Sequence, residues 1–185
     1  MQGNIKVKLF GKKNENYTMV IGCGRLGANL ANALSDIGES VAIIDKNPDA
    51  FRKLASSFGG LTVTGDATEI SVLDNADIAK ATAVISVTNK DNTNIMVALL
   101  AKKMYNIKRV VARLYDPDCE CVYDEFGIET ICPAVLSAKE IDKFLPEFDL
   151  SEKTEIAHTE RDAKQKAGQL HTAAGAGVKD GGAYE

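Results

Sequence analysis

The chain is 185 residues long, is 45% apolar and carries a formal net charge of −4 at pH 7. This length and composition allow one domain of ordinary size with a buried core, the acidic balance disfavours a general nucleic-acid binder, and no apolar run is long enough to cross a bilayer. The four cysteines show neither disulfide-framework nor zinc-site spacing, so we expect free thiols in a reducing cytosol and no bound metal.

Strand-like and helix-like segments alternate along most of the chain. Residues 1–16 carry four lysines and are expected to form a solvated arm, or an arm that docks on a partner or an anionic surface. Strand-like runs follow at 17–21, 41–45, 61–65, 82–87, 109–114 and 129–132. Helical patterns lie between them, at 25–37, 48–58, 69–75, 91–105 and 117–127, and a last helix begins at Pro133. The alternation predicts an α/β fold, a Rossmann-like doubly wound parallel sheet of six strands that is covered on both faces.

The composition changes after residue 150. Residues 151–185 offer few large apolar side chains, so they cannot form a second core. We therefore expect a single domain over 17–148 and a tail over 149–185 that is partly helical and weakly structured. The two histidines, His158 and His171, lie in this tail and are expected to be solvated.

A glycine motif follows the first strand. Residues 22–27 read GCGRLG, and a helical pattern begins at Arg25. In the dinucleotide-binding fingerprint the first glycine permits a tight turn, the second lets a pyrophosphate approach the backbone, and the third lets helix and strand pack closely. The N-terminus of the helix offers free N–H groups and a partial positive charge to that phosphate. The motif therefore predicts a nucleotide site at the point where the strand order reverses.

Acidic residues end the second and third strands. Asp45 lies 18 residues after Gly27, where a carboxylate can accept the ribose hydroxyls and would repel a 2′-phosphate. This favours NAD(H) or a simple adenosine nucleotide over NADP(H), although Lys46 beside it weakens the preference. Asp66, in the segment TGDATE, is placed either to bind an adenine amino group or to cap the helical segment that starts at Glu69.

Polar residues also end the fourth and fifth strands. The segment VTNKDNTN puts Thr88 and Asn89 beside the glycine loop and makes Asp91 a candidate cap of the long helix. Arg113 ends the fifth strand, where it is placed either to meet phosphate charge or to form an ordinary surface ion pair.

The segments GCGRLG, IIDKN, TGDAT, TNKDNTN, VVARLYDP and GIETICP together resemble the TrkA-type N-terminal domain, also called the RCK or KTN domain, of potassium-transport and potassium-channel regulators. The resemblance covers about residues 18–143 and extends to short bacterial TrkA-like proteins that consist of this domain alone. It implies a cytoplasmic regulatory subunit that reaches the inner face of the membrane through a potassium-translocating partner. It also implies a homo-oligomer, a dimer or a ring, whose shape is biased by bound NAD(H), ATP, ADP or AMP.

The resemblance further implies which residues contact the nucleotide: the glycine loop the phosphates, Asp45 the ribose and Asp66 the adenine, with other residues on the far side. The candidate contacts are Gly22, Cys23, Gly24, Arg25, Leu26, Gly27, Asp45, Lys46, Asp66, Ala67, Thr88, Asn89 and Arg113. Two departures from the family matter. Most members continue into a C-terminal RCK domain, which 151–185 cannot form, so the role of that domain would either fall to a separate subunit or be absent. Ala134 follows Pro133 where some relatives have a glutamate that holds a divalent ion, so no metal site is expected.

A regulator and an enzyme make different demands on such a chain. A dehydrogenase needs a substrate pocket that faces the nicotinamide and a general acid or base within it. In this chain the predicted strands and helices are all needed for the nucleotide-binding fold, which leaves no added elements to build such a pocket. We therefore expect that the nucleotide is a signal rather than a reagent and that the protein is not an enzyme. The alternative is a small NAD-dependent oxidoreductase or a redox sensor that uses Cys23.

The last helix has apolar residues at helical spacing. These residues are Ile141, Phe144, Leu145 and Phe148. The spacing predicts either a contact between two copies of the chain or a helix that covers the chain's own sheet.

Overall fold

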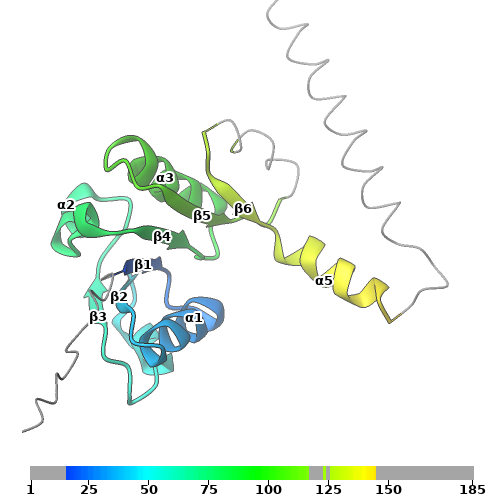
Figure 1. Cartoon of the computed structure of the whole chain (residues 1–185), viewed down its shortest axis with the longest axis horizontal. Helices are drawn as coiled ribbons and strands as arrows, with labels where there is room; N and C mark the ends of the chain where they lie inside the picture. The colour runs from blue at the N-terminus through cyan, green and yellow to red at the C-terminus, as the bar shows by residue number, and fades with distance from the viewer. Residues whose placement is uncertain (1–15, 117–122, 124–125, 145–185) are drawn as a thin grey trace, which may run out of the picture.

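The computed structural model describes residues 16–116, 123 and 126–144. They form one parallel sheet with helices on both of its faces (Figure 1). The strands are β1 (Tyr17–Ile21), β2 (Ser40–Asp45), β3 (Leu61–Thr64), β4 (Ala83–Ser86), β5 (Arg109–Arg113) and β6 (Glu129–Ile131). Their order across the six-stranded sheet is β3-β2-β1-β4-β5-β6. This is the order of a doubly wound Rossmann-like fold, so the predicted fold class is confirmed.

The helices are α1 (Arg25–Asp36), α2 (Ile70–Asn75), α3 (Asp91–Lys103) and α5 (Pro133–Asp142), with 3₁₀ turns η1 (Pro48–Lys53) and η2 (Ile78–Lys80). Within the residues described above, none of these helices is long and apolar enough to span a membrane. The expectations for the N-terminal arm, for most of the helix over 117–127 and for the tail lie outside the described residues.

The helix predicted over 48–58 is wrong in length, because η1 ends at Lys53. Leu54 is already extended, and α1 then binds the segment that follows. The backbone N–H of Ala55 donates to the Asn32 side chain at 3.0 Å, and that of Gly59 donates to Ser35 Oγ at 3.1 Å. These side-chain acceptors hold the backbone in a non-helical path.

Two apolar clusters lie on opposite faces of the sheet. The larger one joins β1 and β2 to α2 and α3 through buried residues such as Met19, Ile44 and Val97. The smaller one joins the same two strands to α1 and η1 through Val20 and Ile43, among others. Because successive side chains of a strand point to opposite faces, β1 and β2 contribute to both clusters and are buried on both sides. Packing on both faces therefore fixes the positions of the carboxyl ends of these central strands.

The face that α1 covers is open over β5 and β6 as far as the described residues show. Arg109, Glu129 and Ile131 are exposed there and Val111 is half-buried, whereas Val110 packs into the cluster beneath α3. A cavity of about 340 Å³ lies along this half of the sheet. The expectation of a sheet covered on both faces is therefore wrong for this part of the described structure. Helix α1 does not extend over these two strands, and no other described helix covers them on this face.

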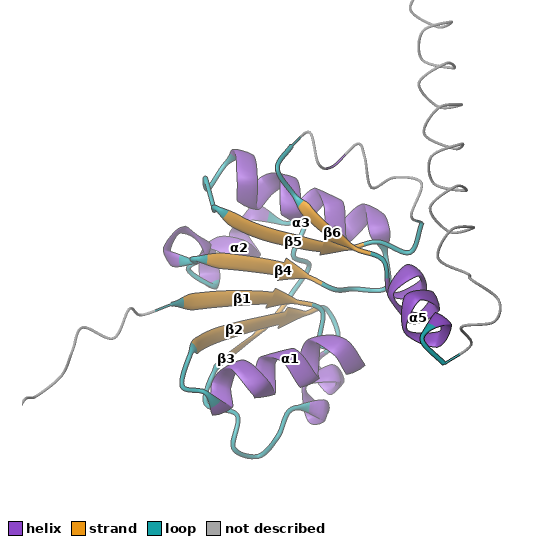
Figure 2. Cartoon of the chain, turned by 45° about the vertical axis from the view of Figure 1, so that its right-hand side comes forward, coloured by secondary structure: helices purple, strands orange, loops and turns teal. Residues whose placement is uncertain are grey.

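Helix α5 stands beyond the carboxyl ends of the strands and projects away from the sheet (Figure 2). It begins directly after β6, with Cys132 as its N-cap and Pro133 in its first turn, where proline suits a helix. None of its residues is buried. Ile141 near its end is 52% exposed, and Phe144 just after it is 82% exposed. The interpretation that this helix covers the chain's own sheet is therefore wrong for its described part. Leu145 and Phe148 lie outside the described residues.

Candidate functional site

The glycine loop joins β1 to α1, and each of its three glycines has a distinct steric surrounding. Gly22 has a φ of +98°, and its N–H donates to the Ile44 carbonyl at 2.7 Å, which closes the turn. A Cβ on Gly27 would lie 1.9 Å from the Gly22 carbonyl oxygen, so only glycine lets α1 approach the strand. A Cβ on Gly24 would meet no atom within 4 Å. Gly24 therefore leaves open space at the start of α1, where a ligand could approach the backbone.

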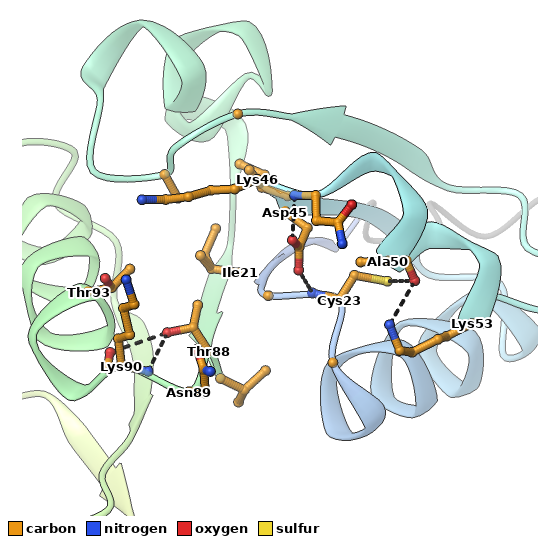
Figure 3. Close-up of a pocket in the computed structure, with 17 residues that line it drawn as sticks. Ile21, Cys23, Asp45, Lys46, Ala50, Lys53, Thr88, Asn89, Lys90 and Thr93 are labelled. Atoms are coloured by element: carbon orange, nitrogen blue, oxygen red, sulfur yellow. Dashed lines mark hydrogen bonds between the residues drawn. The ribbon is translucent and has the colours of Figure 1, made fainter.

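A cleft of about 370 Å³ opens beside this loop, at the carboxyl ends of β1, β2 and β4 (Figure 3). Eight of the candidate contacts line it: Gly22, Cys23, Gly24, Asp45, Lys46, Ala67, Thr88 and Asn89. Five do not: Arg25, Leu26, Gly27, Asp66 and Arg113. Arg25 and Leu26 are exposed in the first turn of α1, directly after the lining residue Gly24. The structure thus gathers at the strand-order reversal residues that are far apart in the sequence.

The Asp45 carboxylate holds the glycine loop against the end of β2. Its Oδ2 accepts the Cys23 N–H at 2.6 Å, and its Oδ1 accepts the Asn47 N–H at 2.9 Å. Each oxygen of an ionised carboxylate has a further lone pair. The same group can therefore fix the loop and still accept a hydroxyl from a ligand in the cleft.

The Asp66 carboxylate is committed to neighbours within the protein. Its Oδ2 pairs with Lys46 Nζ at 2.6 Å, and its Oδ1 accepts from the Thr68 N–H at 3.0 Å and the Thr68 hydroxyl at 2.7 Å. The hydrogen bonds from Lys46 and Thr68 lower the pKa of Asp66 to about 2. Glu69 is the N-cap of α2, so the interpretation of Asp66 as that cap is wrong. The Asp66 side chain instead closes the turn before the helix.

Two further expectations at the strand ends are corrected. Arg113 does not line the cleft, and its guanidinium lies over the Tyr115 ring at 4.7 Å from the ring centroid. Asp91 is not the cap of α3, because Lys90 is the N-cap. The Asp91 carboxylate instead accepts the backbone N–H groups of Tyr115 at 2.8 Å and Asp116 at 3.2 Å. Both side chains are thus bound to the segment that follows β5.

Residues 18–133 of the chain match the family model of the TrkA-N domain. The chain belongs to the TrkA-N domain family. The matched region runs from the second residue of β1 to the first residue of α5 and contains every residue named above as lining the cleft.

A relative and two solved structures place this TrkA-N domain among known proteins. It is 44% identical to the Trk system potassium uptake protein TrkA of Streptomyces coelicolor over 115 residues, which are 62% of this chain and 52% of that protein. The chain spans about half the length of the curated relatives it matches. The GsuK RCK domain superposes with a TM-score of 0.62 and 26% identity over 72% of this chain and 29% of that one. GsuK has also been solved bound to NAD and bound to ADP.

The second structure is the Kef CTD of Shewanella denitrificans in its AMP-bound form. It superposes with a TM-score of 0.58 over 86% of this chain and 99% of that chain. The sequences are 21% identical, so this likeness shows the fold alone.

Sequence reasoning missed Asn94, which is fully buried in the first turns of α3. Its Oδ1 accepts from the Thr88 N–H at 2.9 Å and the Thr88 hydroxyl at 2.7 Å, and its Nδ2 donates to the Thr88 carbonyl at 3.1 Å. Asn94, Val97, Ala98 and Ala101 are spaced along the buried stripe of the TrkA-N domain's longest helix. An amide on an otherwise apolar helical stripe is the signal that could have identified it, because buried polar groups are retained where they are hydrogen-bonded.

Sequence reasoning also missed two cations that line the cleft, Lys53 from η1 and Lys90 from the loop before α3. Lys46 is neutralised by Asp66, whereas Lys53 donates only to the Ala50 carbonyl, at 3.5 Å. In the part of the chain that the structure describes, neither Lys53 nor Lys90 has a carboxylate partner. Their charge favours an anionic ligand.

Cys23 lines the cleft but is fully buried, and its thiol donates to the Ala50 carbonyl at 3.3 Å. Burial raises the pKa of the Cys23 thiol, and the Asp45 carboxylate raises it further, while Lys53 acts in the opposite direction. The thiolate is the reactive form of cysteine, so this surrounding suppresses redox and nucleophilic chemistry at Cys23. Among the described residues, no group of three or more His, Cys, Asp or Glu side chains is placed to hold a metal ion.

Proposed function

We propose that this TrkA-N domain is the nucleotide-binding regulatory part of a potassium transport system and that NAD(H), ATP, ADP or AMP is its signal. The observation that carries the proposal is the cleft itself, which is lined by Gly24 with open space beside it, by Asp45 and by the two cations Lys53 and Lys90. A backbone open to phosphate, an acceptor for ribose and unpaired positive charge together suit an adenine nucleotide. The name of the Streptomyces relative, a potassium uptake protein, supports the transport role.

The surroundings of the cleft favour a signal over a reagent. Among the described residues that line the cleft there is no histidine, and the thiol there, that of Cys23, is buried with a raised pKa. The lining lysines and Asp45 are suited to hold charge and hydroxyls, and Asp45 is already fixed by two backbone N–H groups. A signal acts by binding one conformation of its receptor more tightly than another, which needs no acid or base.

The proposal includes an assembly. We infer that the exposed apolar residues Leu136 and Ile141 of α5, with Phe144 just after the helix, form a contact between copies in a dimer or ring. The oligomer would act on the cytoplasmic side of the membrane through a potassium-translocating partner, and a separate C-terminal RCK subunit would complete it. The unit that does this is the domain proposed for residues 17–148, with the arm and tail outside it.

Calorimetric titration of the nucleotide-stripped protein with NAD⁺, NADH, ATP, ADP and AMP tests the proposal. At least one of these is expected to bind, and Asp45→Ala should weaken it by about tenfold or more, because the variant loses the ribose acceptor and releases the loop. Asp49→Ala is the matched control, because Asp49 lies close by on η1, is not among the residues that line the cleft, and forms a surface ion pair with Arg52.

Three results would count against the proposal. Binding that Asp45→Ala leaves unchanged would show that the ligand lies elsewhere, and no binding of any of the five nucleotides would reject the signal. Steady oxidation of NADH or reduction of NAD⁺ with a small-molecule substrate would support the oxidoreductase instead.

A further inference from the structure

Thr88 lines the cleft, and one side chain, that of Asn94, holds it in place. Asn94 binds all three polar groups of Thr88 that can reach it: the N–H, the hydroxyl and the carbonyl. The same Oδ1 also accepts from the buried hydroxyl of Ser86 at 3.0 Å. Because Asn94 is fully buried and its amide is fully paired, it has a single favourable orientation.

Thr88 in turn touches the glycine loop. A Cβ on Gly22 would lie 3.0 Å from the Thr88 methyl group and 3.1 Å from its Cα and N, so the two backbones are in close contact. Thr88 and Gly22 both line the cleft. Asn94 is therefore bonded to a cleft residue that packs directly against the glycine loop.

The other end of the Asn94 amide reaches the end of β5. Its Nδ2 donates to the Arg113 carbonyl at 2.9 Å. That carbonyl belongs to the same planar peptide group as the Leu114 N–H, which donates to the Ile131 carbonyl of β6 at 2.9 Å. Helix α5 begins two residues after Ile131. Hydrogen bonds through one amide and one peptide plane thus connect Thr88 to the strand from which α5 starts.

We propose that Asn94 is the positioning residue that links nucleotide occupancy of the cleft to the β5–β6 end of the sheet. This inference rests on the proposed function, since it requires that a nucleotide enters the cleft. Asn94 contacts no ligand in this scheme: it holds Thr88 in register with the glycine loop and moves the peptide group between Arg113 and Leu114 when Thr88 moves. Spatial continuity alone does not demonstrate coupling, so the test measures both ends of the path.

Amide hydrogen exchange of the full 185-residue chain, followed by NMR with and without saturating ADP or NAD⁺, provides that measurement. In the wild-type protein the nucleotide is expected to slow exchange at Thr88, which lines the cleft, and also at Leu114, which does not. In Asn94→Ala the affinity should fall about tenfold, and at saturation the response of Leu114 should be lost. Ser86→Ala is the matched control, because it removes one buried hydrogen bond to the same Oδ1 but leaves the bonds to Thr88 and Arg113.

If Asn94→Ala does not fold, Thr88→Val replaces it, because this variant removes the hydroxyl bonds to Asn94 and to the Lys90 backbone but keeps the Asn94 bonds to the Thr88 N–H and carbonyl, and it should reduce the Leu114 response. The inference is overturned if wild-type protein binds nucleotide without a response at Leu114, or if Leu114 responds fully in the folded Asn94 variant. It is also overturned if Ser86→Ala abolishes the response as completely as Asn94→Ala, which would indicate general loosening. If neither ADP nor NAD⁺ binds, whichever of NADH, ATP and AMP binds the wild-type protein replaces them, and failure of all five nucleotides rejects the proposed function itself.

Discussion

Alanine at two glycines of the same loop should separate folding from binding. A methyl group at Gly27 would lie 1.9 Å from the Gly22 carbonyl oxygen, and a normal carbon–oxygen contact requires a shift of more than about 1 Å. Overpacking of this kind costs about 1–3 kcal/mol or more. We therefore expect Gly27→Ala to lower the free energy of unfolding by about 2–3 kcal/mol and the melting temperature by roughly 5–10 °C.

Gly24→Ala should behave in the opposite way. The added methyl group meets no atom within 4 Å, and the φ of −75° is one that alanine adopts. Gly24 is the N-cap of α1, where alanine is worse than glycine by about 0.5–1 kcal/mol. The lower freedom of the unfolded chain offsets this by about 0.4–1 kcal/mol. Stability should therefore change by less than about 0.5 kcal/mol, while the methyl group stands where a phosphate would approach, so nucleotide affinity should fall about tenfold or more.

Urea unfolding followed by circular dichroism measures the first quantity for both variants, and calorimetric titration measures the second. The reasoning is refuted if folded Gly24→Ala binds nucleotide as tightly as the wild-type protein, since the open space would then not be the phosphate site. It is equally refuted if Gly27→Ala is as stable as the wild-type protein, since the close contact with Gly22 would then carry no strain.

Three further predictions concern acid stability, assembly and thiol chemistry. The ion pair and hydrogen bonds of Asp66 lower its folded-state pKa to about 2, so they stabilise the protein above the unfolded-state pKa near 4. This stability is lost as the pH falls from about 4 to about 2. In unfolding titrations, the free energy of unfolding of Asp66→Asn should therefore fall less over this range than that of the wild-type protein. Phe144→Lys should weaken self-association in sedimentation experiments without lowering the melting temperature, because this side chain is 82% exposed in the single chain, and unchanged association would exclude it from the contact. Cys23 should react with iodoacetamide much more slowly in native protein than in urea, as peptide mass spectrometry would show, because burial raises the pKa of its thiol; rapid native labelling would contradict the geometry of the loop.

The sequence predicted the sheet and the glycine loop well for an identifiable reason. β1 and β2 are buried on both faces, so each reads as a short apolar run that ends at a turn or an acid. Gly22 is required by its positive φ and Gly27 by its contact with the Gly22 carbonyl oxygen, and these requirements lie within six residues and so leave a local motif. The cleft could therefore be placed at the carboxyl end of β1 without a structure.

Asn94, which sequence reasoning missed, depends on contacts with strands on both sides of it. Asn94 acts through β4 and β5, and nothing near it in the sequence indicates that its amide meets the Arg113 carbonyl. Arg113 itself was expected to face phosphate, but a nearby aromatic ring binds its guanidinium. The open half of the sheet was not foreseen, because Val111 and Ile131 are apolar whether a helix covers them or not.

The short connection between β6 and α5 has a mechanical consequence. Cys132 is the single residue between the strand and the helix, and the ring of Pro133 restricts the backbone of the first turn. The connection therefore has few free backbone dihedrals. A helix of 10 residues is about 15 Å long, so a tilt of about 10° at its base carries the far end through about 3 Å. A small rotation at the β6 edge of the sheet would therefore move the far end of helix α5 by a distance comparable to the size of a side chain.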